Sequence, residues 1–393
     1  MRKSRHTKKI HSFPAILLLA AIFILPISYS SIPYFASAEG TGYKKGVNSE
    51  DLARMVHKQK IGEIDSFMKE HHERFNFQGN VLVAYKGNRI YEGTFGYSDP
   101  NKRKEPLQKD DIFQLASVTK QFTAMAAMIA IEKGLISYQD TVTHFFPQFP
   151  YGGITVKMLL NHTAGLPNYM WLLEHHWHRE KIPYNTDVID LLAKHRLHLH
   201  FTPGTRFGYS NTGYVVLAAI IEETSGKRFD RFVEQEIFGP LDMDNSFVYS
   251  PSYYNGHRKH LDGYKYWGRG YRRIPATVND GTVGDKGVYS SMEDLFKWDQ
   301  ALYENTLVEG ETMKKAFEPV ELRNGNHYPY GFGFRLRERD GKKVVYHYGK
   351  WNGFRTGIIR YIEDTSTIII LNHTDRPYNS RITKNLRKIL GLG

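Results

Sequence analysis

Cysteine is missing from this sequence altogether. Its absence excludes disulfide bonds, thiol nucleophiles and cysteine-ligated metal centres. Stability must therefore come from packing, and 393 residues with 41% hydrophobic content are enough to bury a large core.

Repeats and nucleic-acid motifs are missing too. No solenoid, collagen or coiled-coil period is visible. No basic and aromatic stripe is present, so we expect no nucleic-acid partner. Acidic residues are fewer than basic ones, 41 against 53, which gives a formal charge of +12. This excess favours association with a membrane surface or anionic wall polymers, although an ordinary solvated surface explains it equally well.

The chain opens with five basic residues within its first nine positions. An apolar run over residues 13–27 follows, and then the small residues Ala36-Ser37-Ala38. This order predicts a signal peptide over residues 1–38, with an uncleaved membrane anchor as the alternative. Residues 1–38 hold those five basic side chains and no acidic one, so the charge without them falls from +12 to +7. In either case we expect the body to be secreted or held at the cell envelope.

Hydrophobic periodicity predicts the elements of the body. Residues 39–58 are polar and predict a flexible tether. Two strands around Lys86-Gly87-Asn88 predict a hairpin. Asn211 or Thr212 is expected to cap the third of the predicted helices. The predicted helices are 61–75, 122–131, 212–224 and 380–390, and the predicted strands are 80–85, 89–95, 332–336, 343–348, 353–362 and 367–371.

Strands at both ends of the chain, with helices between them, predict an α+β fold of the α/β sandwich type. The N- and C-terminal strands would form one antiparallel sheet flanked by helices. The domain would cover residues 59–393, with a mostly helical insertion at about residues 135–285.

The first chemical motif is Ser117-Val118-Thr119-Lys120. Ser117 lies where a loop becomes a helix, close to free backbone N–H groups. Lys120 follows three residues later on the same helix face, so its amine could take the serine proton. Taken alone, the pattern also describes a helix cap followed by a surface lysine.

Two later motifs complete a serine acyl-transfer site. Tyr209-Ser210-Asn211 precedes a helix, where the phenol could pass a proton and Asn211 could bind Lys120 and a substrate amide. His347-Tyr348-Gly349 ends a predicted strand, and Gly349 leaves room for close approach. The N–H groups of Ser117 and Lys350 are the candidates for the oxyanion hole. His347 either brings a positive or hydrogen-bonding group to Tyr209 or is exposed on an edge strand.

These motifs resemble the serine β-lactamase and penicillin-binding protein superfamily. The class C-like branch, with D-alanyl-D-alanine carboxypeptidases, class C β-lactamases and related esterases, is most similar. Its leucine-leucine-x-histidine-threonine-serine-glycine-leucine segment is similar to residues 159–166, and residues 284–298 also look like a family segment. The resemblance covers about residues 60–390. It implies an acyl-enzyme on Ser117, proton transfer by Lys120 and Tyr209, and no metal or other cofactor.

One departure from the family pattern bears on the substrate. The third motif has Tyr348 where the family has a small residue whose hydroxyl grips a substrate carboxylate, and His347 where lysine is common. Arg355 is the candidate for a replacement carboxylate contact. We therefore expect a D-alanyl peptide or ester substrate of the cell wall, including teichoic-acid D-alanyl esters. The alternatives are a β-lactamase or general esterase, and a low-turnover protein that binds β-lactams or the wall.

Six histidines also lie close together in the sequence. Their spacing matches no familiar ligand pattern, and no carboxylate set completes it, so an aromatic lid beside the cleft is favoured over a zinc site. The residues are His175, His176, His178, His195, His198 and His200.

Overall fold

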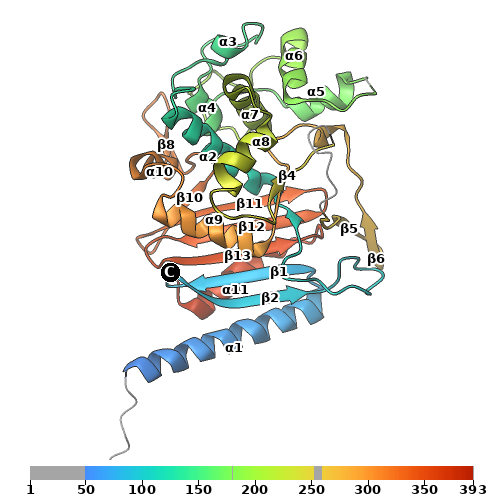
Figure 1. Ribbon diagram of the computed structural model, residues 1–393, viewed down its shortest axis with the longest axis vertical. Coiled ribbons are helices and arrows are strands. Elements are labelled where there is room, and N and C mark those ends of the chain that lie inside the picture. The colour runs from blue at the N-terminus through green and yellow to red at the C-terminus, as the bar shows by residue number, and fades with distance from the viewer. Residues whose placement is uncertain (1–48, 179, 252–258, 393) are drawn as a thin grey trace, which may run out of the picture. The chain divides into compact units, whose positions relative to one another are not determined.

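The computed structural model describes residues 49–178, 180–251 and 259–392. Its centre is a six-stranded antiparallel sheet with the strand order β10-β11-β12-β13-β1-β2 (Figure 1). This confirms the predicted fold class, since strands from both ends of the body share one sheet. The strands are β1 (Gly79–Tyr85), β2 (Asn88–Phe95), β3 (Phe113–Gln114), β4 (Phe247–Val248), β5 (Tyr264–Trp267), β6 (Gly270–Arg273), β7 (Val288–Ser290), β8 (Val320–Glu321), β9 (His327–Tyr328), β10 (Arg335–Arg339), β11 (Lys342–Trp351), β12 (Phe354–Tyr361) and β13 (Ser366–Asn372).

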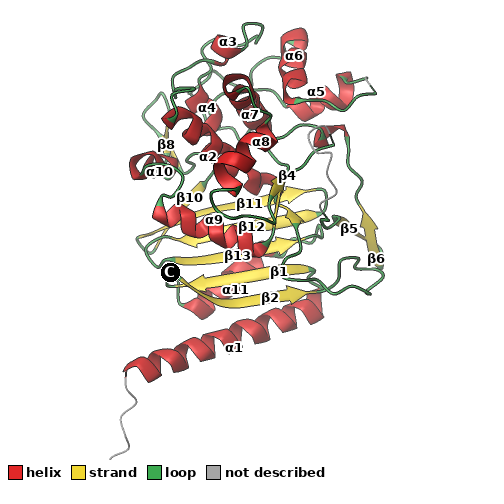
Figure 2. Cartoon of the chain, in the orientation of Figure 1, coloured by secondary structure: helices red, strands yellow, loops and turns green. Residues whose placement is uncertain are grey.

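Helices cover both faces of the sheet (Figure 2). The α-helices are α1 (Ser49–Phe75), α2 (Thr119–Glu132), α3 (Val142–Phe145), α4 (Val156–Leu160), α5 (Tyr169–His176), α6 (Asn185–His195), α7 (Asn211–Ser225), α8 (Phe229–Val233), α9 (Met292–Glu304), α10 (Gly310–Ala316) and α11 (Asn379–Leu390). Shorter helical turns are η1 (Ala116–Val118), η2 (Glu234–Phe238) and η3 (Val278–Asp280).

The two faces of the sheet belong to two separate apolar clusters. Val345 and Ile358 face the larger core, which the central helices α2 and α7 help to form. Ile359, with neighbours from β1 and β13, faces the smaller cluster under α1 and α11. Successive residues of a strand point to opposite faces, so each position of β11 and β12 is assigned to one of these layers.

Helix α9 is fastened to the sheet by a buried ion pair. Arg360 Nε on β12 donates to Asp299 Oδ1 at 2.6 Å, and both side chains are 1% exposed. Thr367 on β13 donates to the same carboxylate oxygen at 2.9 Å. Next to it, Trp298 stacks on Phe122 of α2 with ring centres 4.3 Å apart. This arrangement connects the sheet, α9 and the helix that follows the serine motif.

Three details differ from the sequence predictions. Helix α1 begins at Ser49, so the predicted tether is wrong for residues 49–58, because the helical pattern extends further back than its apolar positions suggest. Residues 39–48 lie outside the described residues. The cap of α7 is Ser210, whose hydroxyl accepts from Gly213 N at 3.3 Å, and neither Asn211 nor Thr212 has this role. Strand β11 continues through Trp351, past the third motif.

The predicted signal peptide also lies outside the described residues. Within the described part of the chain, no helix combines the length and hydrophobicity needed to cross a membrane.

Candidate active site

Ser117 lies in a tight turn at the start of the central helix. The preceding residue, Ala116, has a φ of 51°, in the left-handed region that side chains rarely adopt. This turn carries the chain from β3 through η1 into α2, and it leaves Ser117 partly exposed between the buried residues Ala116 and Val118. A strained residue beside an accessible hydroxyl is typical of functional sites.

Strand β11 packs directly against this turn at Gly349. A Cβ on Gly349 would lie 2.2 Å from the carbonyl oxygen of Leu115 and 3.1 Å from Cβ of Ala116. On β12, Thr356 Oγ1 donates to that same Leu115 carbonyl at 2.6 Å. The serine turn and the third motif therefore meet through backbone atoms. The oxyanion role of the Ser117 and Lys350 N–H groups stays a prediction.

Lys120 is fully buried beneath the serine turn. Its Nζ donates to Asn211 Oδ1 and to the carbonyl oxygen of Asp285, both at 2.8 Å. The contact with Asn211 that the sequence suggested is thus present. The same ammonium lies 5.0 Å from the ring centre of Tyr209 and 5.5 Å from that of Tyr214. Lys120 therefore joins the first and second motifs.

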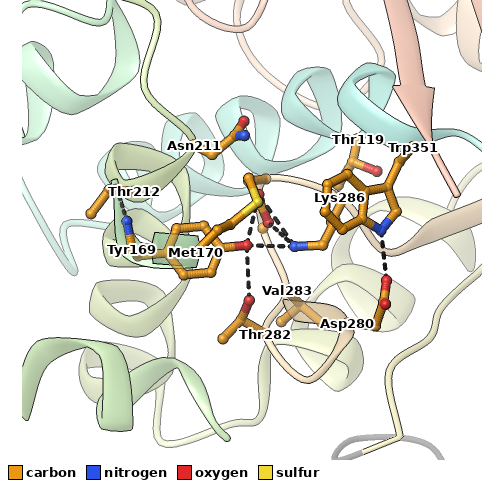
Figure 3. A network of polar contacts seen from close by, with 12 residues as sticks. Thr119, Tyr169, Met170, Asn211, Thr212, Asp280, Thr282, Val283, Lys286 and Trp351 are labelled. Atoms are coloured by element: carbon orange, nitrogen blue, oxygen red, sulfur yellow. Dashed lines mark hydrogen bonds and ion pairs between the residues drawn. The ribbon is translucent and has the colours of Figure 1, made fainter. Parts of the chain in front are cut away.

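The carbonyl that accepts from Lys120 belongs to a buried polar network that the sequence did not indicate. The carboxylate of Asp285 accepts from Tyr169 Oη at 3.0 Å and from Lys286 Nζ at 3.3 Å. Lys286 also donates to Tyr169, and Figure 3 shows it between Tyr169 and Trp351, whose ring centre is 4.9 Å from the ammonium. Burial raises the pKa of the Tyr169 phenol well above its usual value, and Asp285 adds to the effect. The network therefore holds Tyr169 as a neutral donor beside a buried ion pair.

Tyr209 presents a hydroxyl that the fold leaves free. Its oxygen is buried, yet it has no hydrogen-bond partner among the described residues. The Lys120 ammonium and the Arg335 guanidinium lie 5.0 and 5.2 Å from its ring centre. A buried polar atom without a partner costs about 1–3 kcal/mol, so its retention favours a chemical role.

Of the environments predicted for His347, the positive charge and the exposed edge strand are wrong, and the hydrogen-bonding character remains. It is 1% exposed in β11, which lies between β10 and β12 and is not an edge strand. Burial, reinforced by the charges of Lys120 and Arg335, lowers the pKa of its imidazole to about 3. The ring is therefore neutral near pH 7 and brings no positive charge to Tyr209, whose ring centre is 6.1 Å away.

Tyr348 and Arg355 lie on the opposite face of the sheet from the serine turn. Tyr348 Oη donates to Thr383 Oγ1 of α11 at 3.2 Å. Arg355 lies opposite Lys350 in the strand pair, next to the pair formed by Gly349 and Thr356, so the side chains of the two pairs point to opposite faces. Arg355 Nε donates to the Asp375 carbonyl at 2.6 Å. The expectation that Tyr348 alters the carboxylate contact and that Arg355 replaces it is therefore corrected. Strand alternation turns both side chains away from Ser117.

Arg335 is the cation that the sequence reasoning missed. It begins β10, is half-buried, and forms no ion pair with any residue that the structure describes. Its guanidinium lies 5.2 Å from the ring centre of Tyr209 and 5.9 Å from that of Tyr330. Nothing in its local sequence separates it from Arg337 and Arg339 on the same strand, so only the fold identifies it.

A cavity of about 300 Å³ opens beside the second motif. Its lining includes Tyr209, Ser210 and Asn211 from that motif, and Asn168 and His200 from the neighbouring loops. A larger cavity of about 510 Å³ lies between Tyr138, Lys315 and Phe332. Of the three proposed catalytic side chains, Tyr209 lines the smaller cavity, and Ser117 and Lys120 line neither. The smaller cavity is therefore the better candidate for the substrate.

The histidine group forms no metal centre in the described residues, where no three acidic or histidine side chains are placed to share an ion. His175 stacks on Trp171 with ring centres 4.5 Å apart, and His176 stacks on His195 at 3.9 Å. Trp171 is 42% exposed, so these rings form an aromatic surface on α5 and α6.

Comparison with known proteins agrees with this geometry. A model of the β-lactamase family, described as Beta-lactamase, matches residues 64–392. A penicillin-binding protein of Bacillus subtilis (strain 168) is 38% identical over 341 residues, covering 81% of this chain and 73% of that protein. A D-aminopeptidase of Brucella ovis is 24% identical, covering 80% of this chain and 60% of that protein. The octameric penicillin-binding protein homologue from Pyrococcus abyssi superimposes with a TM-score of 0.71 at 26% identity, covering 85% of this chain and 78% of that one.

Proposed function

This chain belongs to the β-lactamase family of serine hydrolases, and from that premise we propose that it is an exported hydrolase of D-alanyl peptides or esters in the cell envelope. The observation that carries the proposal is the buried hydroxyl of Tyr209, which has no hydrogen-bond partner among the described residues. The ring that carries it has its centre 5.0 Å from the ammonium of Lys120, three residues after Ser117. Together these residues supply a nucleophile, Ser117, and two proton-transfer groups, Lys120 and Tyr209.

In the proposed reaction, Ser117 Oγ attacks the substrate carbonyl carbon while its proton passes to the Tyr209 and Lys120 pair. The carbonyl oxygen becomes an oxyanion, which the backbone N–H groups of Ser117 and Lys350 would stabilise. The intermediate then collapses, and the leaving amine or alcohol takes the proton. Water attacks the acyl-serine by the reverse of these steps, which frees Ser117.

The position of Arg335 favours substrates that carry a carboxylate. A half-buried guanidinium without an acidic partner, next to the proton-transfer tyrosine, is suited to a planar anion. Tyr348 does not obstruct this side of the cleft, since its hydroxyl is bonded to α11. We therefore place peptides that end in a D-alanyl carboxylate ahead of esters that lack a carboxylate.

Export and wall association are part of the proposal on sequence grounds. The basic start, the apolar run of residues 13–27 and Ala36-Ser37-Ala38 support a signal peptide or an anchor. The net charge supports contact with anionic wall polymers or lipid head groups.

The test is covalent labelling of the purified protein with a fluorescent penicillin and a fluorophosphonate, with Ser117→Ala in parallel. Mass spectrometry would locate the adduct. Labelling of Ser117 by both probes, followed by release of D-alanine from a D-alanyl-D-alanine peptide, is the expected result. Labelling by the fluorophosphonate alone would favour an esterase, and rapid turnover of nitrocefin would favour a β-lactamase. A folded protein that neither probe labels would leave only a binding role.

A further inference from the structure

Three buried side chains beneath Tyr209 form a continuous hydrogen-bonded bridge across the site. His162 Nδ1 lies 3.1 Å from the backbone nitrogen of Ser210, and its Nε2 lies 3.0 Å from Tyr330 Oη. Tyr330 Oη in turn lies 3.3 Å from His347 Nε2, and His347 Nδ1 lies 2.8 Å from the carbonyl oxygen of Tyr348. The three bridging side chains, His162, Tyr330 and His347, are at most 1% exposed. We call them the buried bridge.

The chemistry of its two ends sets the direction of every proton in the buried bridge. The Ser210 N–H can only donate, so His162 Nδ1 accepts and, in a neutral ring, His162 Nε2 carries the hydrogen. At the other end the Tyr348 carbonyl can only accept, so His347 carries its hydrogen on Nδ1 and accepts at Nε2. Tyr330 then accepts from His162 and donates to His347. The donor and acceptor roles assigned from the two ends are therefore consistent, and each of the four hydrogen bonds contains one proton.

Both rings are held neutral, as this pattern requires. Burial lowers the pKa of His162 well below its usual value, with Lys120, His347 and Arg335 adding to the effect. The pKa of His347 falls to about 3 for the reasons already given. The hydroxyl of Tyr214 also interacts with that of Tyr330. Tyr214 donates its own proton to the Leu160 carbonyl at 2.7 Å, so toward Tyr330 it can act only as an acceptor.

The two ends of the buried bridge lie in the second and third motifs. Ser210 stands between Tyr209 and Asn211 in the second motif, and Tyr348 stands beside Gly349 in the third. The His162 ring also packs on the Tyr209 ring with centres 4.4 Å apart. His162 itself has a φ of 61°, so the chain holds this ring in place at a conformational cost.

Resting on the function proposed above, we propose that Tyr330 is a positioning residue. Through His162 and His347, its hydroxyl sets the distance between the Tyr209 loop and strand β11, so that the phenol of Tyr209 stays aligned with Ser117. Tyr330 does not touch the reacting atoms, and Tyr209 keeps its own hydroxyl free because the bridge passes beneath it.

The first test reads the buried bridge without any activity. Nitrogen-15 NMR of histidine-labelled protein distinguishes protonated from unprotonated ring nitrogens. We expect a hydrogen on Nε2 of His162 and on Nδ1 of His347 across pH 6–8, assigned with His162→Gln and His347→Gln. In Tyr330→Phe the Nε2 of His347 loses its donor, and its signal should move toward that of an unbonded nitrogen. The opposite tautomer at either histidine would overturn the proposal.

The second test measures how fast the serine reacts and how much of the protein reacts. In Tyr330→Phe we expect the rate of fluorophosphonate or penicillin labelling to fall by about tenfold, since small misalignments of catalytic groups are costly. The fraction labelled at saturation and KM for a substrate should stay within about twofold, because the cleft contacts are kept. Tyr328→Phe is the matched control, since Tyr328 is 38% exposed and stacks on Phe207. It should label at the wild-type rate.

The outcomes separate this inference from the proposed function. If the wild-type protein is never labelled, the proposed function fails while the NMR experiment still tests the buried bridge. If the wild type is labelled and Tyr330→Phe reacts at the same rate, the positioning role is wrong. A lower labelled fraction with an unchanged rate would show that Tyr330 serves only folding, which also contradicts the proposal.

Discussion

Gly349 and Leu115 touch so closely that no side chain fits between them. A Cβ on Gly349 would lie 2.2 Å from the Leu115 carbonyl oxygen and 2.4 Å from Thr356 Oγ1. The contact brings the third motif against the turn that carries Ser117, so the geometry of the site depends on a missing side chain.

The Gly349→Ala variant should therefore lose its reactivity. Forcing the strand and the turn apart should slow labelling of Ser117 by about 100-fold and lower stability by about 1–3 kcal/mol. Gly62→Ala on α1 is the control, since no atom lies within 4 Å of the added carbon, and it should raise stability by about 0.5–1 kcal/mol. Labelling kinetics and thermal unfolding would check both. Wild-type labelling by Gly349→Ala would contradict the contact.

Removing the ammonium of Lys120 should abolish most of the reaction. Lys120→Met keeps a long apolar side chain but leaves Asn211 Oδ1 and the Asp285 carbonyl without their donor. We expect labelling to slow by about 10²–10⁴-fold, the range for loss of a proton-transfer group. Lys133→Met removes an exposed lysine paired with Glu236, and it should leave the rate unchanged. Equal rates for the two variants would show that Lys120 takes no part in proton transfer.

Arg335→Met should discriminate between substrates. A charged hydrogen bond to a carboxylate contributes about 1.5–3 kcal/mol, so KM for a D-alanyl-D-alanine peptide should rise by about tenfold or more. KM for an ester without a carboxylate should not change. The control is Arg337→Met, because Arg337 is exposed on the same strand and lies against the ring of Tyr346. Steady-state kinetics with both substrates decide the point, and an equal loss for both would count against carboxylate recognition.

The ion pair between Arg360 and Asp299 should dominate the attachment of α9 to the sheet. Asp299→Ala leaves a buried guanidinium uncompensated, and we expect stability to fall by about 3–5 kcal/mol. Glu70→Ala removes an exposed pair with Arg74 and should cost less than about 1 kcal/mol. Urea unfolding monitored by tryptophan fluorescence measures both. A loss below 1 kcal/mol for Asp299→Ala would show that the pair is dispensable.

Protonation of His71 should lower the free energy of unfolding as the pH falls. Burial lowers the pKa of His71 to about 4 in the folded protein, whereas the unfolded value is about 6.5. Between these values the unfolded chain binds the proton and the folded chain does not, so the contribution of this residue to stability decreases as the pH falls from 6.5 to 4. His71→Phe fits the aromatic surroundings of Phe75 and Tyr378, and it should flatten the decline by up to about 1.4 kcal/mol per pH unit. Unfolding free energies of both proteins at pH 7, 6, 5 and 4 test this, and parallel curves would contradict it.

Local sequence patterns predicted the strands of the sheet, the central helices and the order of the motifs. Two strand-like runs flanking Lys86-Gly87-Asn88 predicted the hairpin of β1 and β2, and the apolar period predicted α2, because both signals are local. Ser117, Lys120 and Tyr209 were found in the same way, from short motifs of fixed spacing.

Which side chains face the site depends on the packing of the whole chain. The faces of β11 and β12 direct Tyr348 and Arg355 toward α11 and leave Gly349 against the serine turn, and motif spacing does not record that alternation. The contacts of Arg335, Tyr330 and Asp285 join segments that are far apart in the chain. Such contacts depend on how the whole sheet and its helices pack, so no local pattern of residues could have predicted them.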